Sequence, residues 1–493
     1  MLDRPAFLGV SRSVLGRRWV APPPAAERAS LALAQATGLP ETVARVLALR
    51  GVPAAEAESY LAPRLRDLMP DPSTLRDMDA AADRLARAVR AGERIAVFAD
   101  YDVDGAASAA LLDRWLRGLG RGATVYVPDR IAEGYGPNVP AMRELGAAHD
   151  LVLCVDCGTV ADAPVAAARE AGADVLVADH HLAGAALPPA LAVVNPNRRD
   201  ESGALGHLCA AGVVFLLIVA ANRALRGSRV RAPDPTPLLD LVALATVADV
   251  APLVGVNRAF VAQGLKVMAA RRNAGLRALA DVARMSGPPS AFHLGFVLGP
   301  RINAGGRVGA AELGARLLAA DDPGEAARLA ETLDGLNRER RAIEAAVQEA
   351  AVAQVEARGA DGPLVWAAGE GWHPGVVGIV ASRLRERFDR PAVVIGLSAG
   401  EGKGSGRSVE GVDLGACVAR LAEEGALLKG GGHRMAAGLT VAEADLETAM
   451  ARLGALLARQ GAGRGGPSDL ALDGALPPGA ASLGLCAALD AAG

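Results

Sequence analysis

Five short apolar runs, each followed directly by polar residues, set the tightest limits on how this chain folds. The stretches between successive runs are long enough for helices, as in residues 106–119 and 160–171. Strands that alternate with helices in this way predict βαβ units, and therefore an α/β fold with a parallel sheet. The runs are Arg94–Ala99, Thr124–Val127, Leu151–Val155, Val175–Ala178 and Leu191–Val194.

The residues that follow these runs are mostly acids, imidazoles and amides. Ligands of open parallel sheets bind at the carboxyl ends of the strands, so we expect these side chains to meet along one edge. In chain order they are Asp100, Asp102 and Asp104, then Asp129, then Asp156, then Asp179, His180 and His181, and finally Asn195 and Asn197.

The segment Asp100–Gly105 carries the strongest signal of a metal site. Its three carboxylates at alternate positions crowd negative charge into one turn, which is unfavourable unless a cation is present. Oxygen ligands suit hard divalent cations such as Mg²⁺ or Mn²⁺. A calcium loop also uses the pattern D-x-D-x-D-G, but it needs an acid at its twelfth position, where this chain has Leu111.

The remaining candidate ligands are weaker when each is taken alone. The pair His180 and His181 follows a strand, although ordinary surface or core histidines also explain such a pair. Asp156 is equally compatible with a helix N-cap, and Asp249 with an ordinary helix terminus. Together with Asp102 and Asp104, these residues supply enough ligands for two cations about 3.5–4 Å apart, with Asp156 as a possible bridge.

Three glycine-rich segments also contain residues suited to phosphate. Glycines let backbone N–H groups approach a phosphate closely, and an arginine can pair with it through two hydrogen bonds. We expect phosphate-binding glycine segments around Arg407 and at 430–433, with a flexible glycine turn as the alternative for each. We predict that Arg301–Arg307 is a tight glycine turn that contacts the phosphate backbone of a nucleic acid.

The bulk composition excludes some classes of protein. A formal net charge of −3 argues against a globally basic nucleic-acid wrapper but leaves room for a local arginine-lined groove. The five cysteines show no disulfide framework, and the pair Cys154 and Cys157 lacks the second pair of a zinc site. The apolar run between His207 and Asn222 is shorter than the ~20 residues of a membrane span, and the first residues do not resemble a secretory signal. These features predict a cytoplasmic protein without a membrane segment.

We predict five regions along the chain. Residues 76–310 form a catalytic domain around the parallel sheet, and a smaller α/β domain follows at 361–458. A long helix is expected to connect them, because Asp322 and Pro323 are a typical helix start. The full division is 1–75 as an N-terminal extension, 76–310, 311–360 as the connecting helix, 361–458, and 459–493 as a linker with an incomplete C-terminal region.

The motifs together resemble those of a known family. Asp100–Gly105, Val155–Gly158 and Ala178–His181 resemble the successive motifs of the DHH phosphoesterases. Further segments resemble the RecJ branch of these enzymes, and the likeness covers about residues 70–458. It implies a DHH domain, a long connecting helix and a DHH-associated domain that together hold a DNA strand. These further segments are Pro128–Arg130, Glu133–Gly136, Pro300–Arg307 and Gly431–His433.

The resemblance also implies roles for individual residues. It makes Asp104, Asp156 and His181 catalytic, with His181 at the scissile phosphate, and it implies two Mn²⁺ or Mg²⁺ ions. The implied metal ligands are Asp100, at the edge of the site, Asp102, Asp104, Asp156, His180 and Asp249. The implied substrate-binding residues are Arg301, Asn303, Arg307, Ser405, Arg407, Gly432 and His433.

The activity implied by the resemblance is hydrolysis of single-stranded DNA from the 5′ end to mononucleotides, in DNA repair and recombination, with a helicase and a single-strand-binding protein as partners. Two alternatives are a phosphatase for short oligonucleotides or small phosphoesters and a non-catalytic DNA-binding scaffold. Family members normally continue into an OB fold that binds single strands, and residues 469–493 are expected only to begin it.

Overall fold

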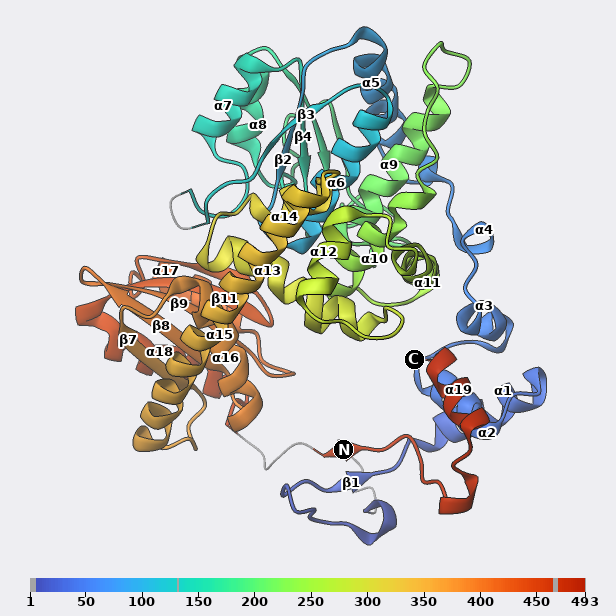
Figure 1. Cartoon of the computed structure of the whole chain (residues 1–493). Helices are drawn as coiled ribbons and strands as arrows, with labels where there is room; N and C mark the ends of the chain where they lie inside the picture. The colour runs from blue at the N-terminus through green and yellow to red at the C-terminus, as the bar shows by residue number, and fades with distance from the viewer. Residues whose placement is uncertain (1–5, 131–132, 464–468, 493) are drawn as a thin grey trace. The chain divides into compact units, whose positions relative to one another are not determined.

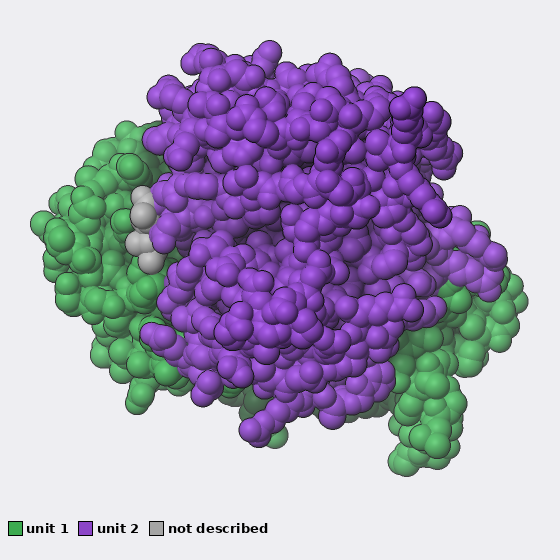
Figure 2. Space-filling model, turned by 45° about the horizontal axis from the view of Figure 1, so that its top comes forward, with its two compact units in different colours: residues 1–62, 340–493 green, residues 63–339 purple. Residues whose placement is uncertain are grey.

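A computed structural model describes residues 6–130, 133–463 and 469–492 of the chain. The chain divides into two compact units, one formed by residues 63–339 and the other by residues 1–62 and 340–493 (Figures 1 and 2). The candidate metal ligands all belong to the unit of residues 63–339, which is described first.

The unit of residues 63–339 is built on a five-stranded parallel sheet (Figure 1). Its strand order is β3-β2-β4-β5-β6. The predicted parallel α/β fold is therefore confirmed, and each predicted run ends within one residue of the corresponding strand. The strands are β2 (Ile95–Ala99), β3 (Ala123–Tyr126), β4 (Leu151–Val155), β5 (Asp174–Ala178) and β6 (Ala192–Val194).

Helices cover both faces of this sheet. Every residue of β2 and β4 is buried, as expected for parallel strands with a helical layer on each side. Side chains of α7 (Val139–Ala148) and α8 (Asp162–Glu170) share one hydrophobic core with one face of the sheet. The other face shares a larger core with α5 (Met78–Ala91), α6 (Val103–Gly118), α9 (Ala210–Ala224) and α10 (Leu239–Ala248).

The order of the strands creates a switch point between β2 and β4. The chain passes from β2 outward to β3, and then returns to the other side of β2 and continues through β4, β5 and β6. The connections leaving β2 and β4 therefore diverge to opposite faces, which opens a crevice at the carboxyl ends of these two strands. The loops that begin at Asp100 and Asp156 start at this crevice.

Hydrogen bonds extend the ladder one residue past the ends of the strands. The N–H groups of Asp100, Asp156 and Asp179 donate to the last carbonyl of the neighbouring strand, at N···O distances of 3.4, 3.1 and 3.1 Å. Each acid is therefore fixed in the same register relative to the sheet, and the three lie along one edge.

The segment around Arg301 corrects one sequence-based prediction. The predicted glycine turn at Arg301–Arg307 was wrong, because these residues lie inside helix α13 (Gly299–Val308), with Pro300 in its first turn. Gly305 and Gly306 serve close packing here, since a Cβ at these positions would meet Leu333 and Tyr101 respectively. The neighbouring elements are α11 (Gly255–Ala269), α12 (Ala274–Val282), a π-helical turn (His293–Leu298) and α14 (Leu313–Ala319).

Helix α15 (Pro323–Arg358) is 36 residues long and belongs partly to each unit. The backbone N–H of Glu325 donates to Asp322 Oδ1 at 2.7 Å, so Asp322 caps this helix as its position before Pro323 predicted. The boundaries proposed for the connecting helix and for the other regions stay predictions.

The second sheet, at residues 365–442, is mixed. Its order is β10-β11-β9-β8-β7, and only β7 and β8 run parallel. Helix α16 (Pro374–Phe388) shares one core with β7 and β8, whereas α17 (Leu414–Glu423) and α18 (Leu446–Arg459) share another with the sheet. The strands are β7 (Val365–Glu370), β8 (Ala392–Ser398), β9 (Glu401–Arg407), β10 (Lys429–His433) and β11 (Ala436–Ala442).

Two further glycine segments, for which a flexible turn was the alternative to phosphate binding, are strands, so the flexible-turn alternative is wrong. Gly404, Gly406 and Arg407 lie in β9, and Gly430–His433 lies in β10. The glycines of β9 make room for neighbouring side chains, because a Cβ on Gly404 would meet Ile395 and Leu439, and one on Gly406 would meet Leu414. The absence of a side chain therefore serves packing of the sheet rather than a change of direction.

The two ends of the chain pair with each other. Strand β1 (Trp19–Val20) runs parallel to β12 (Leu470–Ala471), and α19 (Leu483–Ala492) packs on α2 (Glu41–Leu49) through Leu47 and Leu489. Residues 464–467 of the predicted linker lie outside the described residues, and the beginning of an OB fold at 469–493 stays a prediction. The other short helices of these segments and of the following residues are α1 (Pro24–Thr37), α3 (Ala57–Leu61) and α4 (Leu65–Leu68).

Among the helices that the structure describes, none combines the length and the apolar character that crossing a lipid bilayer requires.

The packing of α11 on α10 gives the first testable prediction. A Cβ at Gly264 would overlap the carbonyl oxygen of Leu239 and the Cβ of Ala243 on α10. We expect Gly264→Ala to lower the free energy of unfolding by about 1–3 kcal/mol, because the two helices must move apart. Urea denaturation measures this loss.

Gly335 on α15 provides the matched control. A Cβ there meets no atom of the described residues within 4 Å. We expect Gly335→Ala to raise the free energy of unfolding by roughly 0.5–1 kcal/mol, because alanine loses less conformational entropy in a helix. Equal effects of the two substitutions would contradict the close packing of α10 and α11.

Candidate metal centre

Seven side chains, the six predicted metal ligands and His181, converge at the edge of the parallel sheet. They form three overlapping groups, and within each group one ligand atom from every residue lies within 4.8 Å of the others. The residues come from three strand ends and the end of a helix. The groups are Asp100, Asp102 and Asp156; Asp104, His180 and Asp249; and Asp156, His180 and His181.

Asp102 and Asp104 are fixed by helix N-termini. Asp102 is the N-cap of α6, and its Oδ1 accepts from the backbone N–H groups of Asp104 and Gly105 at 2.9 and 3.2 Å. The two oxygens of Asp104 accept from the N–H groups of Ala210 and Ala211 at 2.6 and 2.8 Å, at the start of α9. These positive helix ends stabilise both carboxylates where they are needed as ligands.

Asp156 is held in an uncommon backbone conformation. Its φ is 58°, in the left-handed region that aspartate and asparagine tolerate better than most residues. The alternative of a helix N-cap is wrong, because α8 begins after Ala161 and has no side-chain cap. Backbone strain of this kind persists where the surrounding structure holds it, and often at functional sites.

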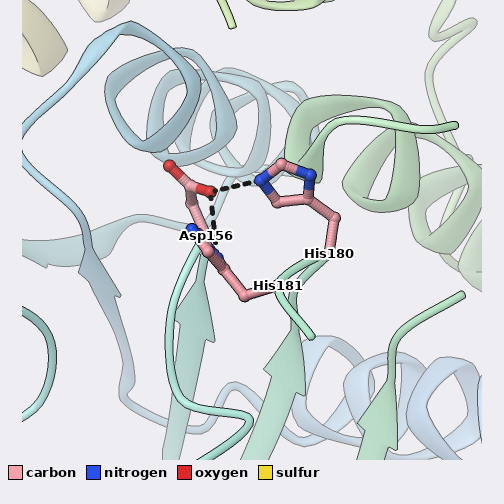
Figure 3. Close-up of side chains that lie close together, drawn as sticks. All are labelled: Asp156, His180 and His181. Atoms are coloured by element: carbon pink, nitrogen blue, oxygen red, sulfur yellow. Dashed lines mark ion pairs between the residues drawn. The ribbon is translucent and has the colours of Figure 1, made fainter. Parts of the chain in front are cut away.

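The carboxylate of Asp156 faces both histidines. Its Oδ1 lies 3.3 Å from His180 Nε2 and 3.9 Å from His181 Nδ1 (Figure 3). This oxygen is buried and receives no hydrogen bond from the described residues. A buried carboxylate oxygen without a donor carries a large desolvation cost, which a bound cation would offset.

His180 is central to the group. Besides Asp156, its Nε2 lies 3.8 Å from Asp104 Oδ2 and 3.8 Å from Asp249 Oδ2. One imidazole nitrogen therefore faces three carboxylates, a set of donors that suits Mn²⁺ and Mg²⁺ with one nitrogen ligand.

His181 is oriented by two residues that the sequence-based site did not include. Its Nδ1 lies 2.8 Å from Asp179 Oδ1, and its Nε2 lies 3.0 Å from the hydroxyl of Tyr135. Asp179 Oδ1 also accepts from the backbone N–H groups of His180 and His181. The position of Asp179 directly before the two histidines was the available signal, whereas the contact with Tyr135 depends on the folded loop.

The carboxylates are electrostatically unfavourable in the absence of a cation. Burial, with the charge of Asp102 next, raises the pKa of Asp100 to about 8. Burial, with the charge of Asp104 next in each case, raises the pKa of Asp249 to about 8 and that of Asp156 well above its usual range. A divalent cation would reverse this balance because it stabilises the ionised forms.

The pKa of His181 is raised, although burial alone would lower it. Burial disfavours the imidazolium, but the hydrogen bond and the charge of Asp179 outweigh it and raise the pKa to about 9. The same pairing lowers the pKa of Asp179 although burial opposes ionisation. His181 is therefore protonated at neutral pH in this arrangement.

The predicted substrate residues of α13 lie next to the metal-binding loop. The Oδ1 of Asn303 accepts from the N–H of Val103 at 3.1 Å and so holds the loop between Asp102 and Asp104. Arg301 is half-buried and donates to Asp334 Oδ1 at 2.9 Å, which gives it a structural contact. Arg307 lies in the last turn of α13.

The other predicted substrate residues form a group in the unit of residues 1–62 and 340–493. Strand pairing places Arg407, Ala436 and His433 opposite one another across three adjacent strands. Arg407 Nη1 lies 2.9 Å from Ser405 Oγ, and a Cβ on Gly378 of α16 would meet both side chains. The fourth predicted residue here, Gly432, has a φ of 150°.

Comparison with known families finds two matching domains. The DHH family, N-terminal domain, matches residues 94–246, and the DHHA1 domain matches residues 350–459. The single-stranded-DNA-specific exonuclease RecJ of Escherichia coli (strain K12) is 40% identical over 438 residues, which are 85% of this chain and 75% of that protein.

Solved structures are similar over most of the chain. The crystal structure of RecJ in complex with Mn²⁺ from Thermus thermophilus has a TM-score of 0.80 and 34% identity, and the match covers 96% of this chain and 67% of that one. The crystal structure of the RecJ–Mg²⁺ complex from the same organism has a TM-score of 0.70 and 32% identity, with 96% and 65% of the chains covered.

The raised pKa of Asp156 leads to the second testable prediction. A raised pKa in the folded state makes the ionised carboxyl destabilising above its ordinary value of 3.8. We expect Asp156→Asn to raise the melting temperature of the metal-free protein by about 1–2 °C at pH 8, equivalent to about 1 kcal/mol, and by less at pH 4. Scanning calorimetry in chelator measures both values.

Asp83→Asn on the exposed face of α5 is the control, with an expected change within about 0.5 kcal/mol. Added Mn²⁺ should stabilise the wild type more than Asp156→Asn, because only the wild type retains the full ligand set. A destabilised metal-free Asp156→Asn would contradict the proposed crowding of charge.

The pairing of His181 with Asp179 gives the third prediction. In Asp179→Asn the burial that lowers the pKa of His181 remains, while the main cause that raises it is lost. We expect the pKa of His181 to fall from about 9 to its ordinary 6.5 or below. Imidazole ¹⁵N NMR of the metal-free protein measures it, with Tyr135→Phe as the matched control because it leaves Asp179 in place. A pKa that stays near 9 in Asp179→Asn would refute the role of the pair.

Proposed function

This chain belongs to the RecJ family of DHH phosphoesterases, and on that basis we propose that it is an exonuclease that hydrolyses single-stranded DNA from the 5′ end to 5′-mononucleotides. The observation that carries this proposal is the convergence of Asp100, Asp102, Asp104, Asp156, His180 and Asp249 at one edge of the parallel sheet. A phosphodiester is a substrate whose hydrolysis a pair of divalent cations can assist.

The residues of the cluster would hold two Mn²⁺ or Mg²⁺ ions, with Asp156 between two of the ligand groups. When bound, such ions lower the pKa of the attacking water and neutralise charge that develops on the phosphate. The chain contributes the geometry, because the sheet edge, two helix N-termini and the end of α10 fix the ligands before the cations bind.

We assign His181 to the scissile phosphate. Pairing with Asp179 raises its pKa to about 9 in the metal-free chain and holds its Nδ1, so its Nε2–H can exchange Tyr135 for a phosphate oxygen. A hydrogen bond from an imidazolium to this oxygen would stabilise the charge that develops in the transition state.

The strand would be positioned by residues outside the metal cluster. In the unit of residues 1–62 and 340–493, Ser405, Arg407, Gly432 and His433 suit a terminal phosphate, since the arginine offers charged donors and the glycine lets a phosphate approach the backbone closely. In the unit of residues 63–339 we assign backbone contacts to Arg307, while Arg301 and Asn303 also hold α13 in place. The predicted division into a DHH domain at 76–310 and a DHH-associated domain at 361–458 fits this assignment.

By analogy with the family, we place the activity in DNA repair and recombination in the cytoplasm. A helicase that exposes single strands and a protein that coats them are the expected partners.

End-labelled substrates give the fourth testable prediction. With Mn²⁺, a 5′-labelled single strand should release its label as a mononucleotide at once, while a 3′-labelled strand should shorten gradually. Chelator should abolish both reactions, and a duplex with flush ends should be resistant. Preference for a dinucleotide over a long strand would instead support a phosphatase for small substrates.

Asp156→Asn is the most informative inactive variant. We expect it to lose at least about a hundredfold in Mn²⁺-dependent cleavage while the fold is retained, because asparagine tolerates the same backbone conformation. Asp104→Ala also removes the acceptor of two N–H groups of α9, so its loss of activity would be combined with loss of stability. Full activity in Asp156→Asn would refute the site.

A further inference from the structure

Two phenylalanines are stacked on the surface of the unit of residues 63–339. The rings of Phe292 and Phe296 have centroids 5.2 Å apart and an interplanar angle of 28°. Their exposed fractions are 63% and 73%, in a chain that contains only seven phenylalanines. Large apolar side chains that gather on a surface commonly mark a binding site, so this pair requires an explanation other than packing.

The pair lies beside the end of the helix that carries Asp249. Phe296 belongs to the π-helical turn His293–Leu298, a conformation that is rare and frequent at functional sites. A Cβ on Gly295 would lie 3.3 Å from Val247, and one on Gly299 would lie 3.3 Å from Ala248. The glycines therefore bring this turn against the last residues of α10, immediately before Asp249.

Phe292 and Phe296 belong to the same helical run as these two glycines. Phe296 follows Gly295 directly, and Phe292 lies three positions before it. Neighbouring positions on a helix differ by about a quarter turn. The next helix, α13, is anchored to the loop of Asp102 and Asp104 through Asn303. The same helical run thus contacts both the end of α10 before Asp249 and the loop that carries Asp102 and Asp104.

Val250 supplies an independent observation at this place. It follows Asp249, it is 85% exposed, and its φ is 58°. A β-branched residue with positive φ is a rare outlier, and such strain is usually kept where it serves a site. Since Val250 is not buried, packing in the core does not account for it.

The start of the π-helical turn is also held rigidly. The Nδ1 of His293 accepts from the backbone N–H of Ser290 at 3.1 Å and lies 2.9 Å from its hydroxyl. The ring of His293 meets that of Phe292 edge to face, with centroids 6.0 Å apart. These contacts hold the ring of Phe292 beside His293, and a preformed surface reduces the entropy that binding costs.

We propose that Phe292 and Phe296 form a stacking platform for unpaired nucleobases of the strand being cleaved. Flat apolar faces are what nucleobases offer once they are unpaired, and aromatic side chains bind them with little dependence on sequence. The platform adjoins the candidate metal centre, so this inference rests on the proposed function. Bases inside a duplex already stack on one another, so the platform would favour single strands.

Binding of a fluorescein-labelled oligothymidylate, followed by anisotropy in chelator, tests the platform without cleavage. We expect Phe292→Ala and Phe296→Ala each to weaken binding about tenfold, and the double variant more. Tyrosine at either position should restore affinity, because it keeps the ring. Leu31→Ala, at an exposed position of α1, is the control and should bind and cleave as the wild type does.

A strand with consecutive abasic sites provides the decisive comparison. Wild-type protein should bind it about as weakly as the double variant binds the intact strand, and the double variant should lose little more. In Mn²⁺, loss of the rings should raise KM rather than lower kcat. The platform would be overturned if the double variant lost as much affinity on going from the intact to the abasic strand as the wild type does. It would also be overturned if the ring variants changed the self-association of the protein and left DNA binding unchanged.

The experiment separates this inference from the proposed function. Wild-type protein that binds the strand through the rings but never cleaves it would refute the nuclease and leave the platform intact. Cleavage with unchanged affinity in the ring variants would refute the platform and leave the nuclease intact.

Discussion

The crowding of buried carboxylates around His180 is the constraint on which the rest of this structure depends. Asp104, Asp156 and Asp249 all face one imidazole nitrogen, and burial raises the pKa of each. Such an arrangement costs stability in the absence of a cation, because charge is removed from water and placed beside like charge. The crowded carboxylates are explained by a role in binding cations, which lowers the stability of the metal-free fold.

The fold meets this cost with rigid supports. The N–H groups of Asp100, Asp156 and Asp179 remain in the hydrogen-bond ladder of the sheet, so the loops cannot relax away from one another. Helix N-termini hold Asp102 and Asp104 with positive partial charge. These contacts place the ligands before metal binds, and such preorganisation is what a catalytic site requires.

Different elements around the metal cluster suit different tasks of a nuclease that acts on unpaired strands. Asp179 orients His181 and raises its pKa. Asn303 of α13 accepts a hydrogen bond from Val103, which lies between Asp102 and Asp104. Phe292 and Phe296 expose apolar rings at the same border. Charged groups for the phosphodiester and flat groups for the bases are thus offered by adjacent elements, and this combination suits a single strand better than a duplex.

The sequence alone was sufficient to determine the parallel α/β fold and the acids that follow the strands, because the apolar period and the residues that end a strand are local features. It failed where glycine was the signal: Arg301–Arg307 is a helix and Gly404–Arg407 is a strand, since absence of a side chain serves close packing as well as turning. Only the tertiary structure decided the strand order, the left-handed conformation of Asp156 and the contact of Tyr135 with His181. These depend on which distant surfaces pack together, and no local pattern encodes that choice.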